Sequence, residues 1–369
     1  MRRLRIKQRL VTLAIAALVV AALGAVVVVG GVVPIRASDG HWPPTKWFLA
    51  FSKNRSVATH STGIQPPGDL ASAARRLRGA GHFETACSNC HGTPLRRRSP
   101  VTLAMTPTPP RLEGVVSERE PEELFYVVQH GILFAGMPAW PTQQRPDEVW
   151  DTVAFLVTLP ETDAQAYREL VFPDAAAAPP PSADGVTAGL LATCTRCHGQ
   201  DGLGRGADAF PHLAGQPREY LLDALEAYAD ARRNSGMMQA VAAVLTDAER
   251  AALADHFAAM PPGGASLDAE SASARELVER GREIAQSGLP ERGVPSCVDC
   301  HGPSEGPRAG DYPRLAGQPA PYLKRQLKLF LQGDRGGGPA ADRMRPVAEN
   351  LPADAFDAVA AYYASLDPD

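Results

Sequence analysis

Residues 194–198 read Cys194-Thr195-Arg196-Cys197-His198, and the same Cys-x-x-Cys-His pattern occurs at residues 87–91 and 297–301. These copies contain all six cysteines of the 369-residue chain. Two thiols three residues apart lie on one helical turn, where they can add to the two vinyl groups of one haem while the adjacent histidine binds the iron. The pattern predicts three covalent haem c groups, attached through Cys87, Cys90, Cys194, Cys197, Cys297 and Cys300, with His91, His198 and His301 as iron ligands.

Two other uses of a Cys-x-x-Cys pair fit this sequence poorly. A zinc site needs two such pairs close together or two histidines shortly afterwards, and these pairs are about a hundred residues apart. A thioredoxin-like redox pair lies at a strand-to-helix junction, and no βαβ pattern surrounds the motifs. No cysteine remains for a structural disulfide, and haem attachment through thioethers is typical of exported proteins.

A methionine follows each motif and could be the second axial ligand of the iron. Met137 lies between Gly136 and Pro138 in a predicted loop, where it has no helix to pack in. Met238 is favoured over its neighbour Met237 because it aligns with Met344 in an internal repeat. We therefore expect Met137, Met238 and Met344 to be the distal ligands. The histidines expected at the surface or at a haem rim are His130, His212 and His256.

The internal repeat relates the second and third motifs. Residues 210–217 recur at 312–319 with an offset of 102 residues, and residues 238–245 match 344–351 after four extra residues. Each motif is also followed by a Pro-x-Leu sequence, which begins at Pro110, Pro211 or Pro313. A proline carbonyl there could accept a hydrogen bond from the iron-binding imidazole, although prolines also interrupt loops for other reasons.

The periodicity predicts an all-α chain without sustained strand alternation. Helices are expected before the motifs, after the two Gly-Gln-Pro sequences, and at the end of each unit; the assigned ranges are 71–84, 189–195, 272–287, 147–159, 247–260 and 354–366. A Ser117-x-x-Glu120 box is expected to cap a helix that runs to His130 and ends at Gly131, and Thr246-x-x-Glu249 is expected to cap another.

The amino terminus predicts a membrane anchor. Five cations, Arg2, Arg3, Arg5, Lys7 and Arg9, precede an uncharged stretch from Leu10 to Ile35, which as a helix would span about 39 Å. A cleaved signal peptide is the alternative, but its apolar run is usually about 7 to 15 residues. The positive-inside rule then places the tip in the cytoplasm and the haem domains in the periplasm, on the inner membrane.

Composition shifts predict three tandem domains after this transmembrane helix. Residues 1–36 form the basic tip and anchor, 37–172 the first domain, 173–184 an Ala/Pro linker, 185–262 the second domain and 263–369 the third. Each domain would hold one haem in a small helical core.

The charge pattern excludes one class of partner. The net charge is −4, and without the five amino-terminal cations the rest of the chain carries −9. A mildly acidic surface argues against nucleic-acid binding and is compatible with a basic redox protein.

The motifs and the repeat resemble a known family. Residues 185–369 resemble the dihaem class I cytochromes c of the c-four type, and residues 70–165, with Gly136-Met137-Pro138, resemble membrane-attached single-haem class I domains. The resemblance implies three class I cytochrome c domains, His/Met ligation, and contact between the proline and the proximal histidine. Triple-haem subunits of membrane-bound alcohol, aldehyde and sugar-acid dehydrogenases have a similar arrangement.

An iron with both axial positions filled has no open site for a substrate. We therefore expect an electron-transfer protein rather than an enzyme, with no small-molecule substrate, that relays single electrons along a respiratory chain. Its donor would be a quinol-oxidising complex or a dehydrogenase, and its acceptor a terminal oxidase or a soluble cytochrome or cupredoxin. The alternatives are the cytochrome subunit of a membrane-bound dehydrogenase and a haem peroxidase, which would need one iron to lose its methionine.

Overall fold

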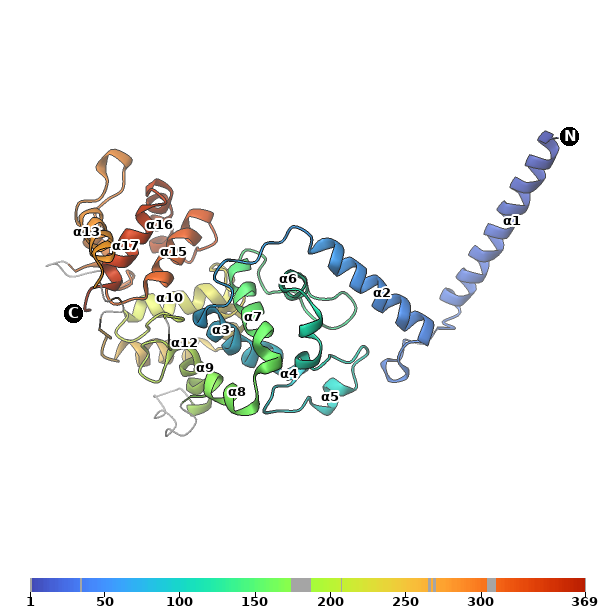
Figure 1. The fold of residues 1–369 in the computed structure, drawn as a ribbon, viewed down its shortest axis with the longest axis horizontal. Coiled ribbons are helices and arrows are strands. Elements are labelled where there is room, and N and C mark those ends of the chain that lie inside the picture. The colour runs from blue at the N-terminus through green and yellow to red at the C-terminus, as the bar shows by residue number, and fades with distance from the viewer. Residues whose placement is uncertain are drawn as a thin grey trace.

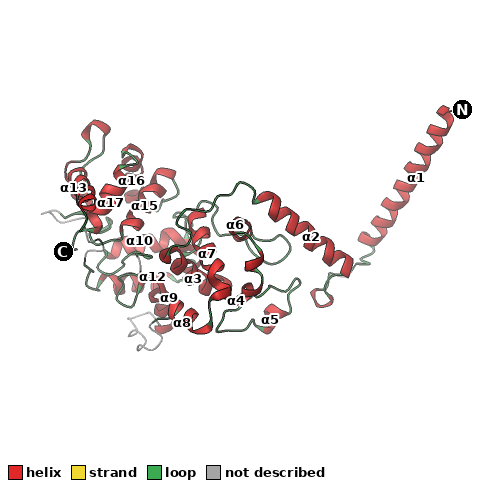
Figure 2. Cartoon of the chain, in the orientation of Figure 1, coloured by secondary structure: helices red, strands yellow, loops and turns green. Residues whose placement is uncertain are grey.

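The computed structural model describes residues 2–33, 35–173, 187–206, 208–264, 267, 270–303 and 310–368. The described chain is helical, with isolated bridges in place of strands (Figures 1 and 2), as the sequence predicts. Its helices are α1 (Arg2–Val29), α2 (Pro43–His60), α3 (Ala73–His82), α4 (Ser88–His91), α5 (Pro100–Leu103), α6 (Pro121–His130), α7 (Pro146–Thr158), α8 (Ala164–Val171), α9 (Ala188–His198), α10 (Arg218–Ala229), α11 (Met238–Ala242), α12 (Asp247–Ala258), α13 (Ala272–Ser287), α14 (Val298–His301), α15 (Ala320–Gln332), α16 (Pro339–Asn350) and α17 (Ala355–Ala364). Short 3-10 turns occur at Ala37–Asp39, Leu112–Gly114, Val116–Glu118, Leu159–Glu161 and Pro290–Arg292, and a π-turn at Phe83–Cys87.

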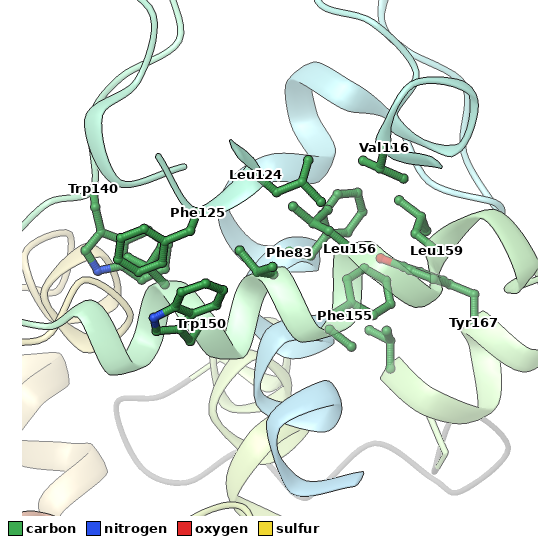
Figure 3. Close-up of a cluster of buried hydrophobic side chains, with 14 residues drawn as sticks. Phe83, Val116, Leu124, Phe125, Trp140, Trp150, Phe155, Leu156, Leu159 and Tyr167 are labelled. Atoms are coloured by element: carbon green, nitrogen blue, oxygen red, sulfur yellow. The ribbon is translucent and has the colours of Figure 1, made fainter. Parts of the chain in front are cut away.

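Three hydrophobic clusters divide the helices into what we call the first bundle (α3 to α8), the second bundle (α9 to α12) and the third bundle (α13 to α17). In the first bundle Phe83 packs against Phe155, with 5.2 Å between the ring centres, and Tyr167 is fully buried beside them (Figure 3). Burying such aromatic side chains supplies most of the stability of a small helical core.

Helices α3 and α7 cross in the first bundle, and α13 and α17 cross in the third. A glycine at each crossing lets the two helices pack closely. A Cβ atom on Gly79 of α3 would lie 2.0 Å from the carbonyl oxygen of Asp151 in α7. A Cβ atom on Gly281 of α13 would likewise lie 2.0 Å from the carbonyl oxygen of Ala358 in α17. Each crossing therefore requires a residue without a side chain.

Most helix ends follow the sequence signals. Thr246 and Glu249 form the expected capping box of α12, and α13 has the expected bounds. Gly131, with φ of 66°, ends α6 as predicted.

The predicted cap at Ser117 is wrong. This residue lies in the 3-10 turn Val116–Glu118, and α6 begins only at Pro121 with Glu120 as the residue before it. Proline is favoured at the first position of a helix because its missing N–H would have no partner there, and this preference decides the start.

The amino-terminal helix is shorter than the apolar stretch. Residues 6–29 are long and apolar enough to cross a membrane, and their 24 residues correspond to about 36 Å. The helix ends at Val29 and does not reach Ile35, because Gly31 takes a left-handed conformation with φ of 62°. The same features fit an anchor or a signal peptide.

The predicted Ala/Pro linker lies, apart from Pro173, outside the described residues. The domain limits set in that region therefore remain a prediction.

Candidate haem-binding sites

Each Cys-x-x-Cys-His motif ends a helix. The second motif is the last turn of α9, while the first and third begin at the residue before α4 and α14. A glycine with positive φ follows every motif histidine: Gly92, Gly199 and Gly302 have φ of 73°, 79° and 70°. All six cysteines are half-buried free thiols, and their i, i+3 spacing puts the two thiols of each motif on one face.

The predicted proline contacts are present in all three motifs. Nδ1 of His91 lies 2.8 Å from the carbonyl oxygen of Pro110. The same contact joins His198 to Pro211 at 3.1 Å and His301 to Pro313 at 3.0 Å. Because a carbonyl can only accept, Nδ1 must carry the proton, and Nε2 keeps the lone pair that a metal needs.

Two of the motif histidines, His91 and His198, favour the neutral form that binds metals. Burial lowers the pKa of His198, and the carbonyl of Pro211 only partly opposes this effect. Burial also lowers the pKa of His91. A neutral imidazole with a fixed tautomer is suited to bind iron.

The predicted ligands of the second and third motifs line one continuous cavity. This cavity has a volume of about 550 Å³. His198 and Met238 lie on its wall, as do His301 and Met344. The structure therefore brings each predicted histidine and its methionine to the same space, within a largely apolar lining.

The two adjacent methionines have different surroundings. Both Met237 and Met238 reach the cavity, but Met237 also packs against the hydrophobic cluster of the first bundle. Met238 begins α11, and its backbone N–H donates to Oγ of Ser235 at 3.0 Å. Met237 thus has a packing contact with the first bundle, and Met238 as the iron ligand remains a prediction from the repeat.

The first motif lies outside this cavity. His91 is the last residue of α4, and Met137 lies in the loop after α6, where the N–H of Ile132 donates to the carbonyl oxygen of Met137 at 3.1 Å. Leu133 and Phe134 in this loop are 82% and 93% exposed. The loop is the open, non-helical segment that the Gly-Met-Pro sequence predicts.

The histidines that we did not assign as ligands have mixed positions. His130 is exposed and lies against Tyr126, with 4.8 Å between the ring centres. His256 is half-buried, and its ring meets that of Phe257 edge-on. His212 lines the cavity, as a residue at a haem rim would.

Two arginines at the cavity, Arg233 buried and Arg335 half-buried, suit the propionate groups of a haem. Arg233 is 6% exposed, and its guanidinium lies over the ring of Tyr228 at 4.6 Å. Arg335 lies over Phe330 at 4.5 Å and donates to the hydroxyl of Tyr220 at 3.1 Å. Within the described ranges neither forms an ion pair with a carboxylate. Cations that are shielded from water and have no carboxylate partner suit the two propionates of a haem.

The sequence reasoning missed both arginines, although a signal was available. They stand 102 residues apart, which is the offset of the repeat, as do Tyr220 and Tyr322. A comparison of the repeats for shared polar residues would have found them.

The described residues do not form a zinc site. In the part of the chain that the structure describes, no group of three or more histidine, cysteine, aspartate or glutamate side chains is placed to hold a metal ion. Each motif instead supplies one histidine and two thiols for attachment.

Comparisons with known proteins agree with this geometry. The family model described as "Cytochrome C oxidase, cbb3-type, subunit III" matches residues 74–156, and the model described as "Cytochrome c" matches residues 182–260. A relative from Thiomonas intermedia (strain K12), named "Thiosulfate dehydrogenase electron acceptor", is 36% identical over 164 residues, which are 44% of this chain and 70% of the relative. The chain belongs to the cytochrome c family.

Two further relatives have the same character. The cytochrome is 37% identical to a "Thiosulfate dehydrogenase electron acceptor" from Stutzerimonas stutzeri (strain A1501), over 47% of this chain and 78% of the relative. It is 32% identical to "Cytochrome c4" from Pseudomonas aeruginosa, over 47% of this chain and 84% of the relative. It is thus a multi-haem class I cytochrome c, an all-α electron-transfer protein with covalently bound haem c.

Proposed function

We propose that this cytochrome is a membrane-anchored relay with three haem centres, each with one histidine and one methionine ligand. The thioether cysteines are Cys87 and Cys90, Cys194 and Cys197, and Cys297 and Cys300; the ligand pairs are His91 with Met137, His198 with Met238, and His301 with Met344. The observation that carries the proposal is the contact of each motif histidine with a proline carbonyl, which leaves Nε2 free of a proton.

A haem c bound at such a site supplies an iron that takes up and releases one electron. The residues of the chain supply the rest. The histidine and methionine of each centre would hold the iron and leave no open position for a substrate, and at the second and third centres the apolar cavity would keep water away. The arginines Arg233 and Arg335 would balance the negative propionates.

The proposed donor is a periplasmic dehydrogenase. Two relatives are named as electron acceptors of thiosulfate dehydrogenase, and the acidic surface suits a basic partner. A terminal oxidase in the same membrane would be the acceptor, since residues 6–29 can anchor the cytochrome beside it. This location places the haem domains in the periplasm, on the side away from the amino-terminal cations.

The test uses the full-length cytochrome in liposomes. Stopped-flow spectroscopy would follow its reduction by thiosulfate dehydrogenase with thiosulfate, and separately by a quinol-oxidising complex with quinol. We expect reduction of all haem equivalents by the dehydrogenase, with a rate that falls as salt screens the charges. Failure of the dehydrogenase to reduce the cytochrome, together with fast reduction by the quinol-oxidising complex, would contradict the proposed donor.

A further inference from the structure

Side chains of the first bundle form hydrogen bonds with the segment that directly precedes Met238 and α11. Glu148 of α7 is 4% exposed. Its Oε1 accepts a hydrogen bond of 2.7 Å from Oγ of Ser235, and its Oε2 accepts one of 2.7 Å from the N–H of Gly236. Arg145 donates to the carbonyl oxygen of Asn234 at 2.8 Å. Three consecutive residues of the second bundle are therefore bound by two side chains of the first.

The same hydrogen-bond chain reaches the backbone of Met238. The Ser235 hydroxyl that donates to Glu148 also accepts the hydrogen bond from the N–H of Met238. Met238 is the first residue of α11, so its N–H has no partner within that helix. Hydrogen bonds in such a chain strengthen one another when they are buried. Glu148 and Met238 are thus linked through one hydroxyl.

Trp140 of the first bundle also contacts this segment of the second bundle, at Gly236. A Cβ atom on Gly236 would lie 2.1 Å from Nε1 of Trp140, so the glycine backbone lies directly against the indole. Trp140 is 6% exposed and follows Met137 by three residues in the loop of the first site. A tryptophan from the segment that follows Met137 therefore lies against the segment that precedes Met238 (Figure 3 shows the Trp140 side chain).

The first bundle also contacts the attachment side of the second motif. A Cβ atom on Gly81 of α3 would lie 2.9 Å from Sγ of Cys197. Arg196, between the two cysteines of this motif, donates to Oγ1 of Thr85 at 3.2 Å. The second site is therefore held by the first bundle on its cysteine side and on its methionine side.

In the third site, Met344 is held in a different way from Met238. The residue three positions before Met344 is Ala341, which has no hydroxyl. Met344 lies inside α16, whose own backbone hydrogen bonds fix it. Among the described residues, the support from a neighbouring bundle is therefore present at Met238 and absent at Met344.

We propose that Glu148 is a positioning residue for Met238, so that the first bundle sets the methionine coordination and the reduction potential of the second haem centre. This inference rests on the proposed function, because it takes Met238 as an iron ligand. The second centre would then differ in potential from the third although both come from the same repeat, since contacts around an axial ligand tune the metal.

The test compares Glu148→Gln with the wild-type, full-length cytochrome. A glutamine of the same size cannot accept both hydrogen bonds, because its amide nitrogen would face a donor. We expect the N–H groups of Gly236 and Met238 to exchange with solvent at least about tenfold faster. We also expect the potential of one haem to shift and the near-infrared methionine-to-iron band to lose up to about one third of its intensity.

Two controls and a second variant make the outcome decisive. Glu161→Gln, at an exposed glutamate of the first bundle, should change none of these quantities. Gly236→Ala should reproduce the effects by pushing the loop from Trp140, whereas Gly189→Ala, with open space around it, should not. Unchanged exchange, potential and band in both Glu148→Gln and Gly236→Ala would overturn the inference. A wild-type cytochrome without methionine-to-iron bands would instead overturn the proposed function.

Discussion

Gln216 of the second bundle and Gln318 of the third bundle make equivalent hydrogen bonds across the boundary between the two bundles. Each side chain binds the backbone of one residue in the other bundle. The side chain of Gln216 donates to the carbonyl oxygen of Arg314 at 2.9 Å and accepts from its N–H at 3.0 Å. Gln318 donates to the carbonyl oxygen of His212 at 2.7 Å and accepts from its N–H at 3.1 Å. Each glutamine therefore binds the residue next to the proline that holds the other bundle's haem histidine.

The glutamine pair predicts a stability effect. Both side chains are about 5% exposed or less, so replacing either with alanine leaves buried backbone groups without partners. We expect Gln216→Ala and Gln318→Ala each to lower the free energy of unfolding by about 1 to 3 kcal/mol, measured by denaturant titration. Gln332→Ala, at an exposed position of α15, is the matched control. Titration midpoints equal to wild type for both variants would show that the bundles are not joined in this way.

The ligand assignment predicts the outcome of methionine substitutions. Leucine has nearly the volume of methionine but no sulfur. Each of Met137→Leu, Met238→Leu and Met344→Leu should therefore remove about one third of the methionine-to-iron band while haem content stays constant.

Met237 tests the assignment within the second site. Because this residue packs against the first bundle, Met237→Leu should leave the band intact, as should Met260→Leu. Loss of the band in Met237→Leu, with retention in Met238→Leu, would exchange the roles of the two methionines.

His82 predicts how stability depends on pH. Its ring is buried against Trp140, with 4.5 Å between the ring centres, and burial lowers its pKa from 6.5 to about 4. As the pH falls below about 6.5, the unfolded chain takes up this proton before the folded protein does, so stability is lost on acidification. The loss attributed to His82 should reach about 2 kcal/mol between pH 7.5 and pH 5.

The measurement is the free energy of unfolding of wild type and His82→Gln at both pH values. Arg78, Glu148 and Asp151 line the same cavity as His82, and they remain in both proteins, so the difference between the two proteins isolates the histidine. A difference that is the same at pH 7.5 and pH 5 would mean that His82 titrates normally in the folded protein.

The crossing of α13 and α17 predicts opposite effects for two glycine substitutions. Alanine favours a helix over glycine by up to about 1 kcal/mol. At Gly281, however, the added methyl group would meet the carbonyl oxygen of Ala358, so Gly281→Ala should destabilise the protein by about 1 to 3 kcal/mol. Gly189→Ala, in open space, should be neutral or stabilising in thermal unfolding. Equal stability of the two variants would contradict this packing.

The elements that local signals control could be predicted from the sequence. The helix 272–287, the capping box at Thr246 and the proline contacts of the three histidines all depend on residues near one another in the chain or on the repeat. The start of α6 was missed because the serine signal competed with Pro121, which is a stronger marker of a first helical position.

The contacts between bundles could not be predicted. Glu148 and Ser235 are 87 residues apart, and neither lies in a motif, so no local pattern pairs them. Asp151 is fully buried and binds Arg75 at 2.8 Å, Arg78 at 2.5 Å and, more distantly, Arg325 of the third bundle at 3.9 Å. In the sequence these residues read as ordinary charges on exposed helices, and only the packing of three bundles makes them internal.

The most direct test of the central claim is the visible and near-infrared spectrum of the purified, full-length cytochrome, oxidised and reduced, with and without carbon monoxide. Three closed centres with histidine and methionine ligands predict three haems per chain, a methionine-to-iron band for each, and no response to carbon monoxide. A shift on adding carbon monoxide in even one haem equivalent would mean an open iron and would contradict the account of the protein as a pure electron relay.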